Sequence, residues 1–138
     1  MTSRPIDATD RLEIAELLNR YGNIIDDREF SRIGEVFTED ARYDVTDFGF
    51  GVLIGTAAIV DAWTRIPNHP LAHHVTNIEI SDPDHETVRA LSKIIGIGPK
   101  GRVGSATYRD VLLHTPDGWR ISERVVTLRH AGNIPEIS

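Results

Sequence analysis

Two adjacent histidines, His73 and His74, are the residues of this sequence best suited to acid–base chemistry. An imidazole titrates near neutral pH, and a carboxylate bonded to one ring nitrogen fixes its tautomer and raises its basicity. The stretch LAHHVTNIEI (71–80) alternates as a β-strand does, so consecutive side chains point to opposite faces. The two histidines therefore cannot hold one metal ion together, and neither has a further ligand at a metal-binding spacing.

The alternation leaves open which histidine faces inward. It groups His73 with Val75, Asn77 and Glu79, and His74 with Thr76, Ile78 and Ile80. If the polar face lines a pocket, His73 is the functional residue. If that face meets bulk solvent, His74 is a core histidine and neither residue is catalytic.

Asp26 is the carboxylate that could pair with a histidine. It ends a strongly apolar helical pattern, although aspartate is a poor helix former. Its neighbours on the helix surface, Gly22 and Ala15, are small and leave room for another group to approach the carboxylate. The alternative is that Asp26 and Asp27 simply end the helix in water.

Other polar side chains suit either the core or a pocket. Tyr21, Tyr43 and Tyr108 could each donate a hydrogen bond into an apolar pocket or serve the core. Arg129 lies near the end of the last predicted strand among apolar residues, where an arginine needs a partner or a pocket. Trp63 is expected to anchor the core. No serine lies in a G-x-S-x-G motif, so a Ser-His-Asp hydrolase is not supported.

The elements that must position these residues follow from periodicity. A helix is predicted over 10–27, with Asp10 as N-cap and Glu13 completing a capping box. Further helices are predicted over 29–40 and over 57–66, the latter capped by Thr56 and ended by Pro67. A strand over 41–48 and the short apolar piece VLI (52–54) lie between them. Strands over 71–80, 87–98, 105–114 and 119–130, joined by tight turns, predict an antiparallel meander and an α+β fold.

Composition limits the class of protein. The 138 residues are expected to form one domain, 1–138, and a net charge of −6 argues against a nucleic-acid partner. No apolar run is long enough to span a membrane, and the first residues lack the pattern of a signal peptide, so a cytoplasmic protein is expected. Without cysteine there is no disulfide, thiolate nucleophile or zinc–thiolate site.

Three segments resemble a known family: IAELLNRYGNIIDDREFSRIGEVFTEDARYD, HHVTN and YRDVLLHTPDGWRISERVVTLR. They are similar to the SnoaL-like group of the nuclear-transport-factor-2-like superfamily, over roughly residues 8 to 130. The resemblance implies a cone-shaped α+β barrel, in which a strongly curved antiparallel sheet wraps around the N-terminal helices and encloses a blind apolar pocket. That agrees with the order of elements predicted above.

The resemblance also implies roles for individual residues. In catalytic members such as scytalone dehydratase, bile-acid dehydratase and hexachlorocyclohexane dehydrochlorinase, a histidine that opens this strand pairs with an aspartate from the first helix. The H-x-x-x-N and Tyr-x-x-x-x-Asp patterns place that pair at His73 and Asp26, with Tyr21 and Arg129 at further active-site positions. The residues expected to bind substrate are Tyr43, Val45, Tyr108, Asn77 and Trp63. The second histidine of scytalone dehydratase is missing from KIIGIG (93–98), so that activity in the strict sense is not expected.

The expected function is that of a cofactor-independent lyase or isomerase. His73, held by Asp26, would remove a proton from carbon of a hydrophobic, cyclic small molecule, and Arg129 and a tyrosine would stabilise the developing negative charge. Two alternatives stay open: an isomerase of the ketosteroid type with an aspartate base, and a non-catalytic binding or assembly subunit. Because strands 87–98 and 119–130 carry apolar residues on both faces, a homodimer or homotrimer is expected.

Overall fold

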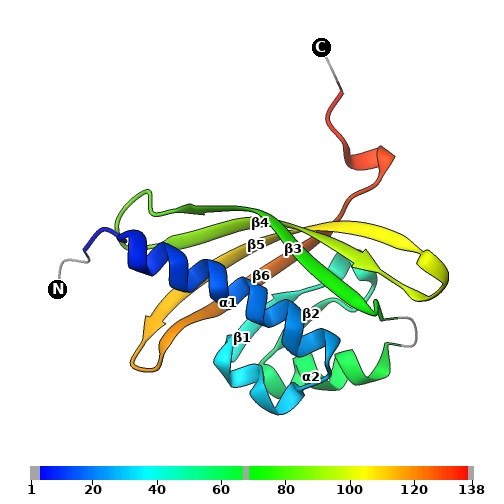
Figure 1. The fold of residues 1–138 in the computed structure, drawn as a ribbon, viewed down its shortest axis with the longest axis horizontal. Helices are drawn as coiled ribbons and strands as arrows, with labels where there is room; N and C mark the ends of the chain where they lie inside the picture. The colour runs from blue at the N-terminus through cyan, green and yellow to red at the C-terminus, as the bar shows by residue number, and fades with distance from the viewer. Residues whose placement is uncertain (1–3, 67–68, 137–138) are drawn as a thin grey trace.

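A computed structural model describes residues 4–66 and 69–136 of the chain. One curved, unclosed sheet with the strand order β2-β1-β6-β5-β4-β3 forms the body, and the longest helix, α1, lies along it (Figure 1). The strands are β1 (Phe37–Asp44), β2 (Val52–Ile54), β3 (Ala72–Ser81), β4 (Val88–Ile97), β5 (Val103–Thr115) and β6 (Gly118–Leu128). The α-helices are α1 (Ala8–Asp26) and α2 (Thr56–Arg65), and the 3₁₀ helices are η1 (Phe30–Glu35), η2 (Thr46–Phe48), η3 (Pro99–Gly101) and η4 (Ala131–Asn133). The predicted α+β class is confirmed.

Helix α1 buries the apolar face that its periodicity predicts, but it begins earlier than expected. Asp7 is the N-cap, and Asp10 closes the capping box as the third helical residue, so the prediction of Asp10 as N-cap is wrong. The Asp10 carboxylate also accepts hydrogen bonds from the Trp119 indole N–H at 3.2 Å and from Arg4. The contact with Trp119 ties the start of α1 to the start of β6. Together the contacts lower the pKa of Asp10 well below its ordinary value, with the hydrogen bond from Arg4 as the largest cause.

The segment between α1 and β3 differs most from the prediction. The helix predicted over 29–40 is only the 3₁₀ helix η1, after which Phe37 already starts β1. Gly55, and not Thr56, is the N-cap of α2, and its φ of +91° favours glycine. Pro67, predicted to end that helix, lies outside the described residues.

The meander of β3 to β6 is antiparallel throughout, as predicted. The first strand, β1, then pairs in parallel with β6 and antiparallel with β2, which makes the sheet mixed. The curved sheet holds α1 and α2 against one buried cluster of apolar side chains. In the described part of the chain, no helix is long and apolar enough to cross a membrane.

A bulge in β3 answers the question of which histidine faces inward. The pairing of β3 with β4 shifts register between Thr76 and Glu79, and Asn77 in the bulge has a φ of +53°. The extra residue moves the later side chains to the opposite face, so that Ile78 and Ile80 pack against the core on the same side as Val75. The predicted grouping of Ile78 and Ile80 with His74 is therefore wrong: His73 is partly buried and His74 is exposed.

The backbone of Asn77 gives a prediction for stability. A β-branched residue is strained at positive φ, so Asn77→Val is expected to lower the free energy of unfolding by about 1–2 kcal/mol. Asn77→Gly is expected to change it little, because glycine adopts this conformation freely. Urea unfolding of both variants measures the difference. Glu79→Val, an exposed site without positive φ on the same strand, is the control, and an equal loss in the three variants would contradict the prediction.

Candidate active site

The last residue of α1 and the second residue of β3 make a short polar contact. The Nδ1 atom of His73 lies 2.6 Å from Oδ1 of Asp26. The backbone N–H of His73 also donates to the same carboxylate, at 2.8 Å and 3.0 Å to its two oxygens. The His73 side chain is 7% exposed and the Asp26 side chain is 17% exposed. Because an ionised carboxylate only accepts, Nδ1 carries the hydrogen, and Nε2 is left as the acceptor.

Helix α1 can approach β3 this closely because residue 22 is glycine. A Cβ atom there would lie 3.2 Å from the backbone oxygen of His73, closer than most side-chain contacts. One turn later, Asp26 reaches the outer edge of β3 and caps its free N–H. Gly22, which the sequence analysis noted as a small neighbour of Asp26, therefore allows the Asp26 carboxylate to reach His73.

Three tyrosines, which we call the tyrosine cluster, share one hydrogen-bonded group beside this pair. The Tyr21 hydroxyl lies 3.3 Å from that of Tyr43 and 3.2 Å from that of Tyr108. The Tyr21 ring is also 6.5 Å from the ring of His73, edge to face. Burial raises the pKa of all three phenols, so they remain neutral donors at physiological pH.

A buried ion pair that the sequence analysis missed lies against the tyrosine cluster. Arg124 on β6 donates through Nε and Nη2 to Asp110 on β5, at 2.7 Å and 2.8 Å, and both side chains are fully buried. The guanidinium carbon lies 4.2 Å from the ring centre of Tyr21 and 4.0 Å from that of Tyr108. Burial opposes the charge of Arg124, but the charge and hydrogen bonds of Asp110 outweigh it and raise the pKa of Arg124.

His69 is the second residue that the sequence analysis missed. Its ring centre lies 5.0 Å from that of His73, on the chain that leads into β3. Burial, followed by the neighbouring His73, lowers the pKa of His69 to about 4. His69 therefore stays neutral beside His73 at neutral pH. The sequence did contain a signal for His69, since it is a third histidine just before His73 and His74.

The lowered pKa of His69 predicts how stability depends on pH. Between pH 6.5 and pH 4 an unfolded His69 takes up a proton while the folded one stays neutral, so acidification favours unfolding in this range. The stabilising contribution is complete above pH 6.5 and falls as the pH approaches 4. In His69→Gln the free energy of unfolding, measured with urea at several pH values, is expected to fall less over this range. His74→Gln, which changes an exposed histidine, should behave like the parent chain, and unchanged pH dependence in His69→Gln would refute the prediction.

The other predicted site residues are placed in two different environments. Tyr43, Val45, Tyr108 and Trp63 are buried, and Trp63 lies 5.9 Å from Tyr21 between ring centres. Asn77 is exposed in the bulge, and Arg129 is exposed just after the end of β6. The buried arginine of that strand is Arg124, so the oxyanion role expected of Arg129 stays a prediction.

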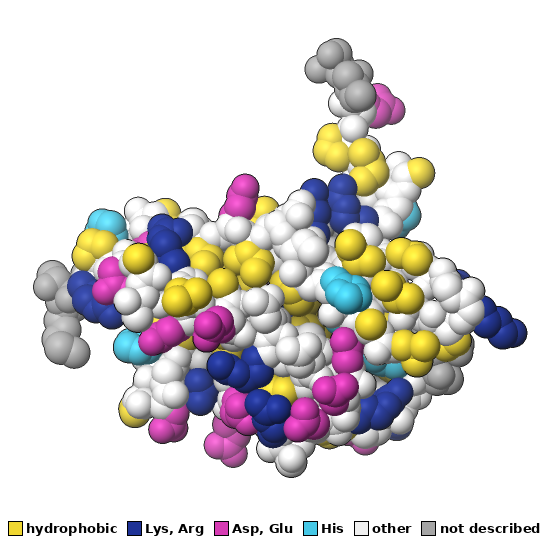
Figure 2. All heavy atoms as spheres, in the orientation of Figure 1, with side chains coloured by type: hydrophobic (Ala, Val, Ile, Leu, Met, Phe, Trp, Pro, Cys, Tyr) yellow, Lys and Arg dark blue, Asp and Glu magenta, His cyan; other side chains and the backbone are white. Residues whose placement is uncertain are grey.

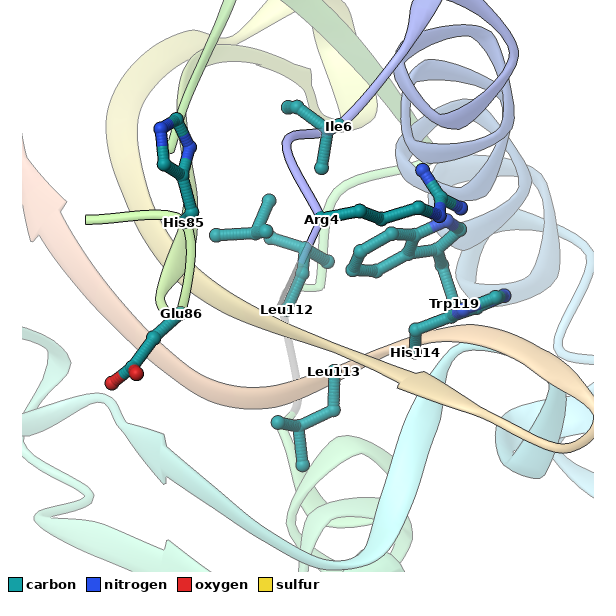
Figure 3. A pocket seen from close by; sticks show the side chains of 9 residues that line it. Arg4, Ile6, His85, Glu86, Leu112, Leu113, His114 and Trp119 are labelled. Carbon is teal, nitrogen blue, oxygen red and sulfur yellow. The ribbon is translucent and has the colours of Figure 1, made fainter. Parts of the chain in front are cut away.

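Two surface cavities lie outside the tyrosine cluster. One, of about 250 Å³, is lined by Arg4, His85, Leu112 and Trp119 among others (Figure 3). The other, of about 310 Å³, is a groove between α1 and β3, lined by Asn19, Asn23 and residues 73–76. Within residues 4–66 and 69–136, no group of three or more His, Cys, Asp or Glu residues is placed to hold a metal ion.

The chain is similar to one protein family and to several solved structures. The model of the family described as SnoaL-like domain matches residues 7–125. Uncharacterized proteins of Mycobacterium tuberculosis and Mycobacterium bovis are 35% identical over 130 residues, covering 86% of this chain and 85% of theirs. An NTF2-like protein with a cystatin-like fold from Novosphingobium aromaticivorans superposes with a TM-score of 0.75 and 25% identity, over 89% of this chain and 84% of that one. A hexachlorocyclohexane dehydrochlorinase superposes with a TM-score of 0.72 and 18% identity over 90% of each chain, a likeness of fold.

Proposed function

The chain belongs to the SnoaL-like domain family, and from that premise we propose that it is a cofactor-independent lyase or isomerase acting on a hydrophobic, cyclic small molecule. The family resemblance predicted from the sequence is confirmed. The observation that carries the proposal is the partly buried 2.6 Å contact between His73 and Asp26 beside the tyrosine cluster. The name of one structural neighbour supports the substrate class, because hexachlorocyclohexane is a halogenated ring.

In this proposal His73 is the general base. Asp26 holds the hydrogen on Nδ1, so Nε2 takes a proton from carbon, and the carboxylate stabilises the imidazolium that results. The backbone N–H of His73 bonds the same carboxylate and fixes its orientation. General-base catalysis of this kind contributes about 10²–10⁴-fold.

The tyrosine cluster supplies a hydrogen-bond donor for the developing negative charge. Three hydroxyl groups carry one hydrogen each, and the contacts of Tyr21 with Tyr43 and Tyr108 use one hydrogen apiece. Whichever way the hydroxyls turn, one hydrogen is left over. That hydrogen can bond a carbonyl or leaving-group oxygen of the substrate, as an oxyanion donor does.

In this proposal Arg124 supplies the positive charge that the sequence analysis expected from Arg129. Its Nη1 atom has no hydrogen-bond partner in the described part of the chain. Its positive charge against the rings of Tyr21 and Tyr108 opposes the rise that burial causes in the pKa of both phenols. Arg124 therefore makes the spare hydroxyl hydrogen a stronger donor.

The rival functions make different demands on Asp26. A ketosteroid-type isomerase needs an aspartate that reaches substrate carbon, whereas both oxygens of Asp26 are engaged by His73. A binding or assembly subunit needs no such pair, and its Asp26 would face solvent. The contact between His73 and Asp26 therefore favours His73 as the base. The three tyrosine side chains are buried, so a substrate reaches their hydroxyl groups only when side chains move apart.

Deuterium exchange tests the proposal without knowledge of the natural substrate. Cyclic ketones with a hydrogen on the carbon beside the carbonyl are incubated with the chain in D₂O, and deuterium uptake at carbon is followed by NMR. The parent chain and His74→Gln are expected to accelerate uptake, and His73→Gln is expected to leave it at the uncatalysed rate. Saturable binding of the ketones without any exchange would favour the binding module instead.

A further inference from the structure

The two edges of the sheet differ in what covers them. The outer edge of β3 is covered by α1: Asp26 accepts from the His73 backbone N–H, and Arg11 donates to the backbone oxygen of Ile80 at 3.0 Å. At the opposite edge β2 is the last strand of the sheet. Free strand edges pair readily with another chain, so proteins usually cover, charge or twist them.

The segment around β2 is a short edge strand of three residues, but no charge protects it. It reads FGFGVLI (48–54) and contains no charged residue. Its apolar side chains are exposed to an unusual degree: Phe48 44%, Phe50 45%, Val52 40% and Ile54 61%. An uncharged apolar edge of this kind is stable in solution when something covers it.

The backbone of β2 shows which groups are free. Val45 donates to the oxygen of Gly51, and Gly55 donates to that of Ala41, so hydrogen-bonded pairs with β1 fall on every second residue. Because Tyr43 is opposite Leu53, the N–H and C=O groups of Leu53 face β1. Those of Val52 and Ile54 face outward.

We propose that a second copy of this chain covers this edge, with the two β2 strands antiparallel about a two-fold axis at Leu53. In that register Val52 is opposite Ile54 of the second copy, and each pair exchanges both backbone hydrogen bonds. The exposed side chains of the same two residues then pack across the axis, and no charge of the segment 48–54 is buried. The edge is thus complementary to itself, in backbone and in side chains. The inference does not depend on the proposed chemistry.

A second exposed apolar surface could also be the interface between two copies. Figure 2 shows hydrophobic side chains gathered over the start of β3 and the β4–β5 hairpin. We call this the hairpin patch; its exposed members are Leu71, Ile95, Ile97 and Val103. Lys100 and Arg102 lie in the same hairpin and are exposed, so two copies facing one another there would bring like charges together.

Cysteine cross-linking tests the register, because the natural chain contains no cysteine. In the proposed dimer the two copies of residue 53 are opposite each other with Cα atoms about 4.5 Å apart, within reach of a disulfide. The two copies of residue 54 are offset by two positions and about 8 Å apart, too far for one. Oxidised Leu53→Cys is therefore expected to run as a covalent dimer, and Ile54→Cys, although more exposed, as a monomer. Equal cross-linking of both variants, or of neither, would overturn the register.

Light scattering over a wide concentration range tests the interface itself. The parent chain is expected to form a reversible dimer, and Ile54→Lys to raise its dissociation constant by at least about tenfold, as loss of a buried isoleucine implies. Val103→Lys, an equally exposed site in the hairpin patch, is the matched control and should dimerise like the parent. A parent chain that stays monomeric, or a dimer that Val103→Lys breaks and Ile54→Lys does not, would overturn the proposal.

Discussion

Replacement of His73 by glutamine is expected to lower kcat/KM by about 10²–10⁴-fold, on whichever cyclic ketone the exchange screen identifies. Glutamine keeps a hydrogen-bond donor near Asp26 but has no basic nitrogen to take a proton from carbon. The loss should be in kcat more than in KM, because the base acts in the transition state. An isomerase with an aspartate base would instead keep most of its activity in this variant.

Asp26→Asn completes the test of the pair. Asparagine keeps the size of the side chain, but its amide nitrogen cannot accept from the backbone or ring N–H groups of His73. If the two residues act as one unit, the double variant should be no slower than His73→Gln alone. Initial rates of the single and double variants, with urea unfolding to confirm folding, give the comparison. Losses that multiply in the double variant would mean that the residues act independently.

The sequence predicted those parts of the fold that local periodicity encodes. The buried face of α1 and the antiparallel meander repeat a regular pattern over many residues, and both are confirmed. The parallel pairing of β1 with β6 joins strands distant in the chain, so no local pattern announces it. The segment EFSRIGEVF has apolar residues at helical spacing, but η1 ends at Glu35 and Phe37 starts β1, with Val36 and Phe37 packed into the core. Tertiary packing overrode the helical pattern there.

The candidate site was predictable only in part. Asp26 and His73 carried a local signal, a carboxylate with small neighbours and a histidine on a strand, and the family resemblance then selected between the two histidines. The bulge at Asn77, which sets the faces of β3, contains no glycine, and the asparagine that tolerates its positive φ is a weak signal in the sequence. Arg124 was missed because an arginine in an alternating strand is ordinarily exposed. Its partner was the available signal, since Asp110 lies directly opposite it on β5.

Asp110→Asn is expected to be the most destabilising conservative substitution in the chain. It leaves the Arg124 guanidinium buried without a counter-charge, against the aromatic rings of Tyr21, Tyr108 and Phe37. Breaking a fully buried ion pair in this way typically costs about 3–5 kcal/mol, which for a chain of this size is roughly 10–20 °C in Tm. Thermal unfolding followed by circular dichroism measures the shift. Glu35→Gln, which breaks the exposed ion pair with Arg32, is the control and should change Tm little.

The double variant Asp110→Leu with Arg124→Met separates stability from function. Removing both charges also removes the cost of burying them, so this variant is expected to recover most of the stability that Asp110→Asn loses. It is nevertheless expected to lose activity, because no charge then polarises the tyrosine cluster beside His73. Recovery of Tm together with loss of exchange activity would mean that the ion pair is retained for the chemistry of the site. Full activity in the stable double variant would contradict the role given to Arg124, and with it the account of how the tyrosine cluster donates its spare hydrogen.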